Sequence, residues 1–282
     1  GIYKVTNVTV ENNLVSDVGN AIYMYLADNC VVNKNRISLV HASSFSITGI
    51  YLAGSSGNVI SSNKIGDCKG NGICANNGGR TLNAASTDNK ITGNIINNTL
   101  NDGIYIGTGS TGTVISKNDV GVSNKSGIVV LDSKKCQVIS NKVSDCRLDG
   151  IYLKNIGDTD IKSNNVTTVK RYGVQVISSQ LKSLYGNTIT GNGNCGLRIV
   201  QSGISGSQQN RLRNNGSSYA VYSRNSTGSV LVRLPASARI TRNTARITGT
   251  AAGGRRLTVY VVTKSGNKRI GQGNVTSRGR YS

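Results

Sequence analysis

The hydrophobic positions along the chain recur in a unit of about 23 residues. Within each unit apolar and polar residues alternate, as in Ile151–Tyr152–Leu153, and alternation with a period of two predicts short β-strands. We expect about three strands in each unit. One column of the repeat holds an apolar residue that usually follows glycine: Ile2, Ile22, Ile50, Ile73, Ile104, Ile128, Ile151, Val174, Leu197 and Val221.

A second column repeats an asparagine that stands two residues before an apolar residue. Both columns lengthen at the same two places, near residues 38–46 and 77–87, so they describe one repeat. Stacked units would close a continuous core, and a turn asparagine can hydrogen-bond its copy in the next unit. We therefore interpret this column as structural: Asn12, Asn35, Asn63, Asn94, Asn118, Asn141, Asn164, Asn187 and Asn210.

The repeat resembles the right-handed parallel β-helix proteins, a superfamily that includes pectate lyases, alginate epimerases and phage tailspikes. The resemblance covers residues 1–225 and is carried by segments such as GIYLAGSSGNVISSNKI and GIYLKNIGDTDIKSNNV. It implies an all-β fold, a right-handed parallel β-helix of about ten turns. It does not imply one activity, because the same repeat also builds non-catalytic surface proteins.

From about residue 226 the repeat ends. The segment ARITGTAAGGRRLTVYVVTK resembles the first part of a bacterial immunoglobulin-like domain, as do the turn Gly249–Thr250–Ala251 and the closing Gly279–Ser282. This implies a partial Ig-like β-sandwich over residues 226–282. Such a sandwich lacks its last strands and would leave an unpaired edge, so we expect the chain to be part of a longer multidomain protein.

Charge is distributed unevenly along the chain. The net charge is +21, and residues 161–282 hold 19 basic residues and no acidic one, because Asp160 is the last carboxylate. Such a surface attracts polyanions. Nucleic acid is a less favoured partner, since no recognition helix, zinc finger or RNP-like motif accompanies the charge. No apolar segment approaches the roughly 18 residues of a membrane span.

The position after the first column is expected to face outward, and it holds tyrosine in six of the ten units. Tyrosine rings stack on sugars, while nearby Lys and Arg can pair with uronate or sulfate groups. The alternative is that tyrosine simply suits a half-exposed strand. The candidate substrate-binding residues are Tyr105, Tyr152, Lys154, Arg171, Gln175, Arg198 and Tyr222.

Catalytic motifs of the superfamily are absent from the sequence. It has neither the N-T-D, D-D and G-H-G elements of polygalacturonases nor the D-P-H-E motif of alginate epimerases, so the catalytic residues stay unknown. Calcium-dependent pectate lyases use an Asp cluster. Here Asp67 and Asp145 occupy equivalent turn positions three units apart, about 14 Å at the strand spacing. That separation is too long for one calcium shell. We expect no metal and no cofactor.

The six cysteines do not form a disulfide framework in this repeat. Cys30 and Cys136 share a column four units apart, about 19 Å at the strand spacing, beyond the reach of a disulfide. Cys68 and Cys146 share another column, three units apart. We expect most of the cysteines to be small buried thiols in the core.

These features favour a secreted or cell-surface module that engages an anionic polysaccharide or another polyanion. As a lyase or epimerase, it would neutralise a uronate with Arg or Lys while a Lys or Tyr abstracts the C5 proton. Alternatively, the protein is a non-catalytic adhesin or stalk in which the β-helix is a rigid spacer.

Overall fold

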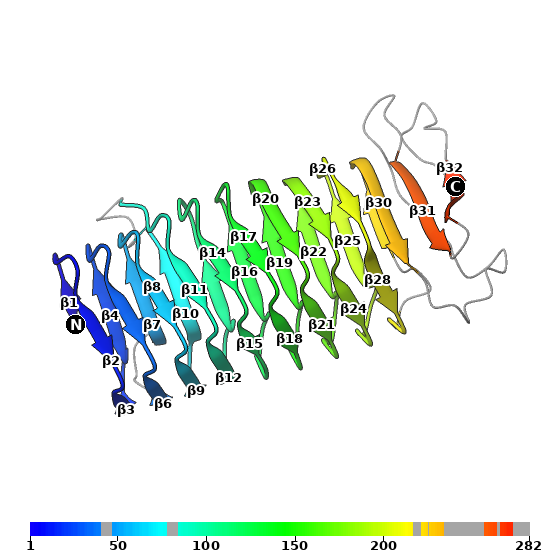
Figure 1. Cartoon of the computed structure of the whole chain (residues 1–282). Coiled ribbons are helices and arrows are strands. Elements are labelled where there is room, and N and C mark those ends of the chain that lie inside the picture. The colour runs from blue at the N-terminus through cyan, green and yellow to red at the C-terminus, as the bar shows by residue number, and fades with distance from the viewer. Residues whose placement is uncertain are drawn as a thin grey trace.

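The fold is a coil of stacked turns that form one elongated β-helix (Figure 1). Strands and turns make up the described residues, with no helix among them. No segment of this part of the chain could therefore cross a membrane as a helix. The computed structural model describes residues 1–40, 47–77, 84–216, 221–224, 226–233, 257–263 and 266–272.

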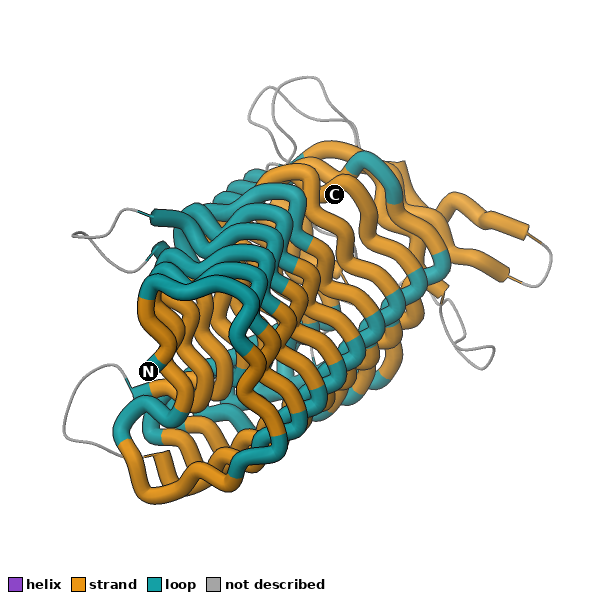
Figure 2. Tube along the Cα trace, turned by 60° about the vertical axis from the view of Figure 1, so that its left-hand side comes forward, coloured by secondary structure: helices purple, strands orange, loops and turns teal. Residues whose placement is uncertain are grey.

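The first sheet takes one strand from each turn and is parallel throughout. Figure 2 shows the successive turns lying over one another. Its ten strands confirm the expected parallel β-helix architecture. They are β1 (Ile2–Tyr3), β4 (Ile22–Tyr25), β7 (Thr48–Ala53), β10 (Asn71–Asn76), β13 (Ile104–Ile106), β16 (Ile128–Leu131), β19 (Ile151–Lys154), β22 (Val174–Ile177), β25 (Leu197–Val200) and β29 (Val221–Arg224).

Two further rows of parallel strands close each turn. The second row contains β2 (Thr9–Glu11), β5 (Val31–Asn33), β8 (Val59–Ser61), β11 (Lys90–Thr92), β14 (Val114–Ser116), β17 (Gln137–Ile139), β20 (Gly157–Lys162), β23 (Gln180–Tyr185), β26 (Gly203–Ile204) and β27 (Ser207–Gln208). The third row contains β3 (Leu14–Val18), β6 (Arg36–Val40), β9 (Lys64–Cys68), β12 (Ile95–Thr99), β15 (Asp119–Val120), β18 (Lys142–Ser144), β21 (Asn165–Thr167), β24 (Thr188–Thr190) and β28 (Asn210–Arg213).

Strand β30 (Thr227–Arg233) pairs in parallel with both β26 and β28 and so continues the coil past residue 225. It is followed by β31 (Leu257–Thr263), parallel to β30, and by β32 (Gly266–Gln272), antiparallel to β31. Most of the predicted Ig-like segment 226–282, including both of its quoted motifs, lies outside the described residues. The division of the chain near residue 225 stays a prediction.

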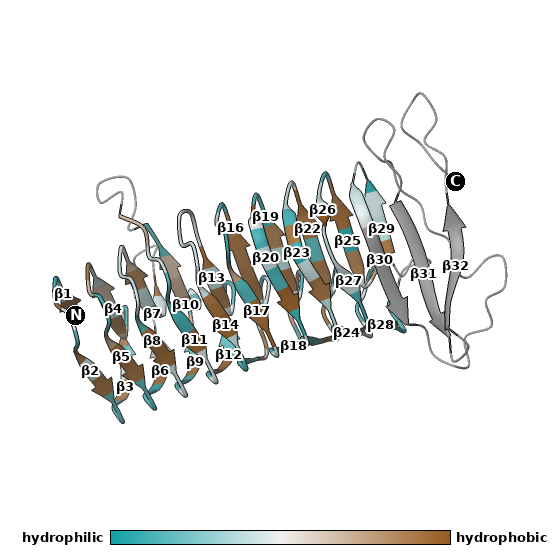
Figure 3. Ribbon diagram, turned by 45° about the horizontal axis from the view of Figure 1, so that its top comes forward, coloured by the Kyte–Doolittle hydropathy of each residue, from teal (hydrophilic) through white to brown (hydrophobic). Residues whose placement is uncertain are grey.

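The core is built from columns of aliphatic side chains. Ile50, Ile73, Ile104 and Ile128 are cross-strand neighbours in the first sheet, and all four are fully buried. Figure 3 shows the hydrophobic segments recurring from turn to turn along the rod. The alternating pattern of the sequence thus corresponds to one side chain inward and the next outward.

Glycine precedes this column because the chain passes close to the third row. A Cβ on Gly127 would lie 2.3 Å from Val143 Cγ1 and 2.9 Å from the carbonyl oxygen of Gly150. Both distances are shorter than a carbon atom tolerates. A side chain at this position would therefore force the first sheet and the third row of strands apart.

The asparagine column forms a continuous hydrogen-bonded ladder. Asn141 donates from its backbone N and from its Nδ2 to Asn164 Oδ1, both at 3.0 Å, and its Nδ2 also donates to the Ile115 carbonyl oxygen at 2.9 Å. The same side-chain link recurs at each step from Asn13 to Asn210. The structural interpretation of this column is confirmed.

The first turn differs from the predicted register. Asn13, rather than Asn12, begins the ladder, and Ile2 lies beside Met24 rather than Ile22. From the first turn to the second, the predicted spacing is 20 residues in the apolar column and 23 in the asparagine column. In the structure the spacing is 22 residues in both columns. A common spacing is required because two columns of the same turn must advance together.

We predict that Asn164→Ala destabilises the protein by about 2 kcal/mol or more, because each buried partner left unpaired costs about 1–3 kcal/mol. The partners left are Asn141 and the Val138 carbonyl oxygen. Urea unfolding measures the change. The control is Asn165→Ala, an exposed neighbour on the same turn, which should alter stability little. Equal stability of the two variants would contradict a stabilising ladder.

Candidate functional site

The outer face of the first sheet carries most of the predicted site residues in one column. The cross-strand register runs Tyr105, Val129, Tyr152, Gln175, Arg198 and Tyr222, from β13 to β29. Lys154 lies two residues beyond Tyr152 on β19 and is exposed. Arg171 comes from the turn before β22. The structure therefore brings all seven predicted residues to one side of the coil.

Arginine and tyrosine side chains interleave at the C-terminal half of this face. Arg198 Cζ lies 5.3 Å from the ring centroid of Tyr172 and 5.7 Å from that of Tyr222. Arg171 Cζ lies 5.5 Å from the Tyr172 centroid. Guanidinium groups at these distances are attracted to the ring faces. We call Arg171, Tyr172, Arg198 and Tyr222 the arginine–tyrosine cluster.

Asp149 and Gln175 both contact the guanidinium group of Arg171. Its Nε lies 3.5 Å from Asp149 Oδ1, and its Nη2 donates to Gln175 Oε1 at 3.2 Å. Asp149 also accepts a hydrogen bond from the Tyr172 backbone N, at 3.2 Å. Gln175 is only 3% exposed. Its position suits orienting the guanidinium of Arg171 more than direct contact with a ligand.

Burial and neighbouring charges shift the pKa of Asp149 in opposite directions. Burial raises the pKa of this carboxyl above its usual value, while the Arg171 guanidinium, the Tyr172 backbone N–H and Arg198 lower it. A buried carboxylate is stable when such partners compensate the lost hydration. The charge of Asp149 is therefore supported by Arg171, the side chain that it contacts, and by the more distant Arg198.

Tyr152 lies within reach of these charges. Burial and the Asp149 carboxylate raise the pKa of its phenol, whereas Arg171 and Arg198 lower it. Because the net effect is upward from a value near 10, the phenol keeps its proton at neutral pH. Tyr152 is therefore suited to donate a hydrogen bond or a proton.

Two residues of this site were not among the predicted ones, Asp149 and Tyr172. Both occupy the turn position directly before the repeat glycine, one turn apart. The equivalent Asp102 accepts a hydrogen bond from the Ser126 backbone N in the next turn at 2.8 Å. Side chains at this position lie at the edge of the outer face. The sequence could have pointed to them, because they directly precede the repeated glycine of each unit.

A shallow groove of about 300 Å³ lies elsewhere, on the third row of strands. It is lined by Arg36, Lys64, Asp67 and Ile95, among others, on β6, β9 and β12. None of the predicted site residues lines it, so it is separate from the outer face of the first sheet.

All six cysteines are free and buried, and four of them, Cys30, Cys68, Cys136 and Cys146, belong to the hydrophobic core, which confirms the expectation that most are core thiols. Burial raises the pKa of Cys68, Cys74 and Cys146 to about 12, so these thiols are unreactive at neutral pH. Within the described ranges, no three His, Cys, Asp or Glu side chains come together as metal ligands. That the protein uses no cofactor stays a prediction.

The family described as "Right handed beta helix region" matches residues 1–120 and 102–245. The two matches together cover most of the chain. The protein belongs to the right-handed β-helix family. No curated protein matches the sequence.

Solved β-helix structures resemble the protein in fold at low sequence identity. The periplasmic alginate epimerase AlgG is 16% identical, with a TM-score of 0.64 over 86% of this chain and 70% of that one. The A-module of the mannuronan C-5 epimerase AlgE6 from Azotobacter vinelandii is 11% identical, with a TM-score of 0.62 over 90% and 89% of the two chains.

A phage protein shows the same likeness. The enzymatically active domain of tailspike protein 2 from bacteriophage CBA120 is 13% identical, with a TM-score of 0.59 over 92% of this chain. The protein spans 42% of the length of that tailspike chain. At these identities the likeness establishes the β-helix fold, and the site must be argued from its own residues.

We predict that Arg171→Met raises the pKa of Asp149 further, because a cation that stabilises the carboxylate is removed. A carboxyl-carbon NMR titration measures this pKa. The control is Arg147→Met, an exposed arginine in the turn before Asp149, which should leave this pKa unchanged in the same titration. An unchanged pKa in Arg171→Met would show that the two side chains do not interact in solution.

Proposed function

We propose that the outer face of the first sheet, from β13 to β29, binds an anionic polysaccharide at the cell surface or outside the cell. The arginine–tyrosine cluster is the observation that carries this proposal. An acidic sugar has an apolar ring face and a carboxylate, and this cluster offers rings for stacking and guanidinium groups for ionic hydrogen bonds.

The fold neighbours support a polysaccharide as the ligand class. AlgG and AlgE6 are named as epimerases of alginate and mannuronan, and the tailspike domain is named as enzymatically active. The strand columns also suit a polymer, because one outward side chain recurs at each strand spacing of about 4.8 Å. A chain lying along the coil would contact several turns at once.

We predict that Arg198→Met weakens binding of polyuronate about tenfold at low salt, as expected for one lost ionic hydrogen bond. Binding should fall as salt rises, because exposed charges are screened. Tyr152→Ala should weaken the salt-resistant part, which stacking supplies. Isothermal titration calorimetry at several salt concentrations measures both effects.

Arg211→Met provides the matched control, since Arg211 is an exposed arginine on β28 in the third row. This substitution changes the net charge of the protein by the same amount as Arg198→Met, and it should leave the affinity for polyuronate nearly unaltered. If DNA, heparin and polyuronate bind alike, and the site variants equal this control, the surface is a nonspecific polyanion surface. The adhesin or stalk function would then be favoured.

A lyase or epimerase activity at the same face is a second candidate. It is favoured by the neutral phenol of Tyr152 among the charges of Asp149, Arg171 and Arg198. An arginine that neutralises a uronate carboxylate makes the C5 proton more acidic. Tyr152 could then supply a proton, to the leaving oxygen in a lyase or to C5 in an epimerase. Lys154, in its unprotonated form, is the candidate base that takes the C5 proton, so that one proton is removed and one is supplied.

We predict that the protein incubated with polyuronate forms an unsaturated, ultraviolet-absorbing product if it is a lyase. An epimerase would instead exchange C5 hydrogen for deuterium in D₂O, followed by NMR. Tyr152→Phe should slow either reaction about 100-fold, the usual contribution of a positioned acid or base. Tyr185→Phe, on β23 of the second row, is the control. Binding without product or exchange would identify a binding module.

A further inference from the structure

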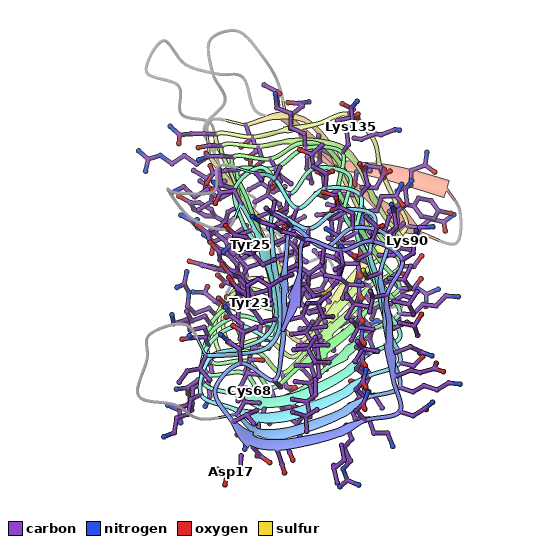
Figure 4. All side chains as sticks on the ribbon, turned by 90° about the vertical axis from the view of Figure 1, so that its left-hand side faces the viewer. Asp17, Tyr23, Tyr25, Cys68, Lys90 and Lys135 are labelled. Carbon is purple, nitrogen blue, oxygen red and sulfur yellow. The ribbon has the colours of Figure 1, made fainter. Side chains whose placement is uncertain are left out.

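The N-terminal end of the same outer face carries a cluster of four tyrosines, Tyr3, Tyr23, Tyr25 and Tyr51, which we call the N-terminal tyrosine cluster. Tyr23 and Tyr25 both project from β4 on one side of the coil, opposite Lys90 (Figure 4). Tyr51 is the cross-strand neighbour of Tyr23, and Tyr3 is that of Tyr25. The corrected register of the first turn is what places Tyr3 there.

The rings of this cluster form one continuous aromatic surface. The Tyr23 centroid lies 5.2 Å from that of Tyr51, 5.7 Å from that of Tyr3 and 6.3 Å from that of Tyr25. The planes of Tyr23 and Tyr25 differ by 22°, so these two rings are nearly parallel. Tyr3 is 58% exposed, which is high for a large aromatic residue.

The cluster differs in charge from the other end of the face. The pKa of Tyr23 is raised by burial and by its neighbours Tyr3 and Tyr25. In contrast, the pKa of Tyr152 responds to Asp149, Arg171 and Arg198. Among the described residues, the cation–π contacts fall on Tyr172 and Tyr222, and none falls on the N-terminal cluster. The ring faces of the N-terminal tyrosine cluster are therefore not occupied by a cation of the described residues, whereas those of Tyr172 and Tyr222 are.

The tyrosine hydroxyls add polar groups at the rim of this aromatic surface. The Tyr51 hydroxyl donates to Asn76 Oδ1 at 2.9 Å. Within the part of the chain that the structure describes, the hydroxyls of Tyr3, Tyr23 and Tyr25 make no hydrogen bond. Clustered rings with free hydroxyls match a pyranose ring, which has an apolar face and hydroxyls around its edge.

We propose that the N-terminal tyrosine cluster binds uncharged pyranose units of a polysaccharide whose acidic units lie against the arginine–tyrosine cluster. The preferred ligand is then a heteropolysaccharide of neutral and acidic sugars. The two clusters share one sheet face, and Tyr23 on β4 and Arg198 on β25 are seven strands apart, about 34 Å at the strand spacing. The binding of acidic units at the arginine–tyrosine cluster rests on the proposed function. The binding of uncharged units at the N-terminal tyrosine cluster does not.

The test uses two hexasaccharides, one of β-linked glucose and one of uronate, with tyrosine-ring NMR shifts as the readout. The glucose oligomer should shift Tyr23 and Tyr51 at millimolar concentration, equally at low and high salt. The uronate oligomer should shift Tyr172 and Tyr222 and be weakened by salt. Tyr23→Ala should abolish the first response only, and Tyr185→Ala, an exposed tyrosine on β23, should leave both unchanged.

A decasaccharide that alternates glucose and glucuronate should bind more tightly than the uronate hexamer. Tyr23→Ala should weaken its binding about tenfold, and Tyr23→Phe, which keeps the ring, should restore most of the loss. Melting temperatures of both variants separate loss of binding from loss of folding. If Tyr23→Ala unfolds the first turn, the glucose-induced shifts in the native protein still decide the point.

Two results would overturn the inference. No tyrosine shift with the glucose oligomer, while the uronate oligomer still binds, would reject the neutral subsite and leave the proposed function intact. Sedimentation equilibrium showing a dimer that Tyr23→Ala abolishes would identify a second copy of this chain as the occupant. If instead the glucose oligomer binds and the uronate oligomer does not, the neutral subsite stands and the proposed function fails.

Discussion

The hydrogen-bonded spacing between successive turns, about 4.8 Å, constrains every position of this β-helix. A residue in one turn has its counterpart directly above and below it, so each position must tolerate its own repetition. Asparagine does so because its side chain both donates and accepts, which builds the ladder through Asn141 and Asn164. Like charges opposite each other repel. In the column of Arg198, the neighbours are accordingly Gln175 and Tyr222.

The same constraint makes the candidate site linear. Side chains that would surround a small ligand in a globular enzyme are here arranged along the axis, one turn after another. A polymer suits this arrangement because its own repeat meets new side chains at each turn. The side chains of the face change along the axis, from the tyrosines around Tyr23 to Arg198 between rings, without any change in the strand pattern of the backbone.

The sequence predicts the columns well because burial and hydrogen bonding select the same residue types in every turn. The inward isoleucines, the buried cysteines and the outward position of Tyr105 and Tyr152 follow from this regularity. The turns are less predictable, since their side chains are not fixed by alternation. The approach of the Tyr172 ring to Arg198, and the hydrogen bond from Arg171 to Gln175, depend on side-chain conformations that the repeat does not specify.

Asp149 sets the charge balance of the arginine–tyrosine cluster. Without it, the guanidinium groups of Arg171 and Arg198 would face each other across Tyr172 with no counter-charge. One buried carboxylate neutralises only one of the two, and it is committed to Arg171 at 3.5 Å. Arg198 is half-buried beside two rings, and no carboxylate of the described residues lies within ion-pair distance of it. This charge beside aromatic rings is the feature on which the proposed binding of an acidic sugar rests.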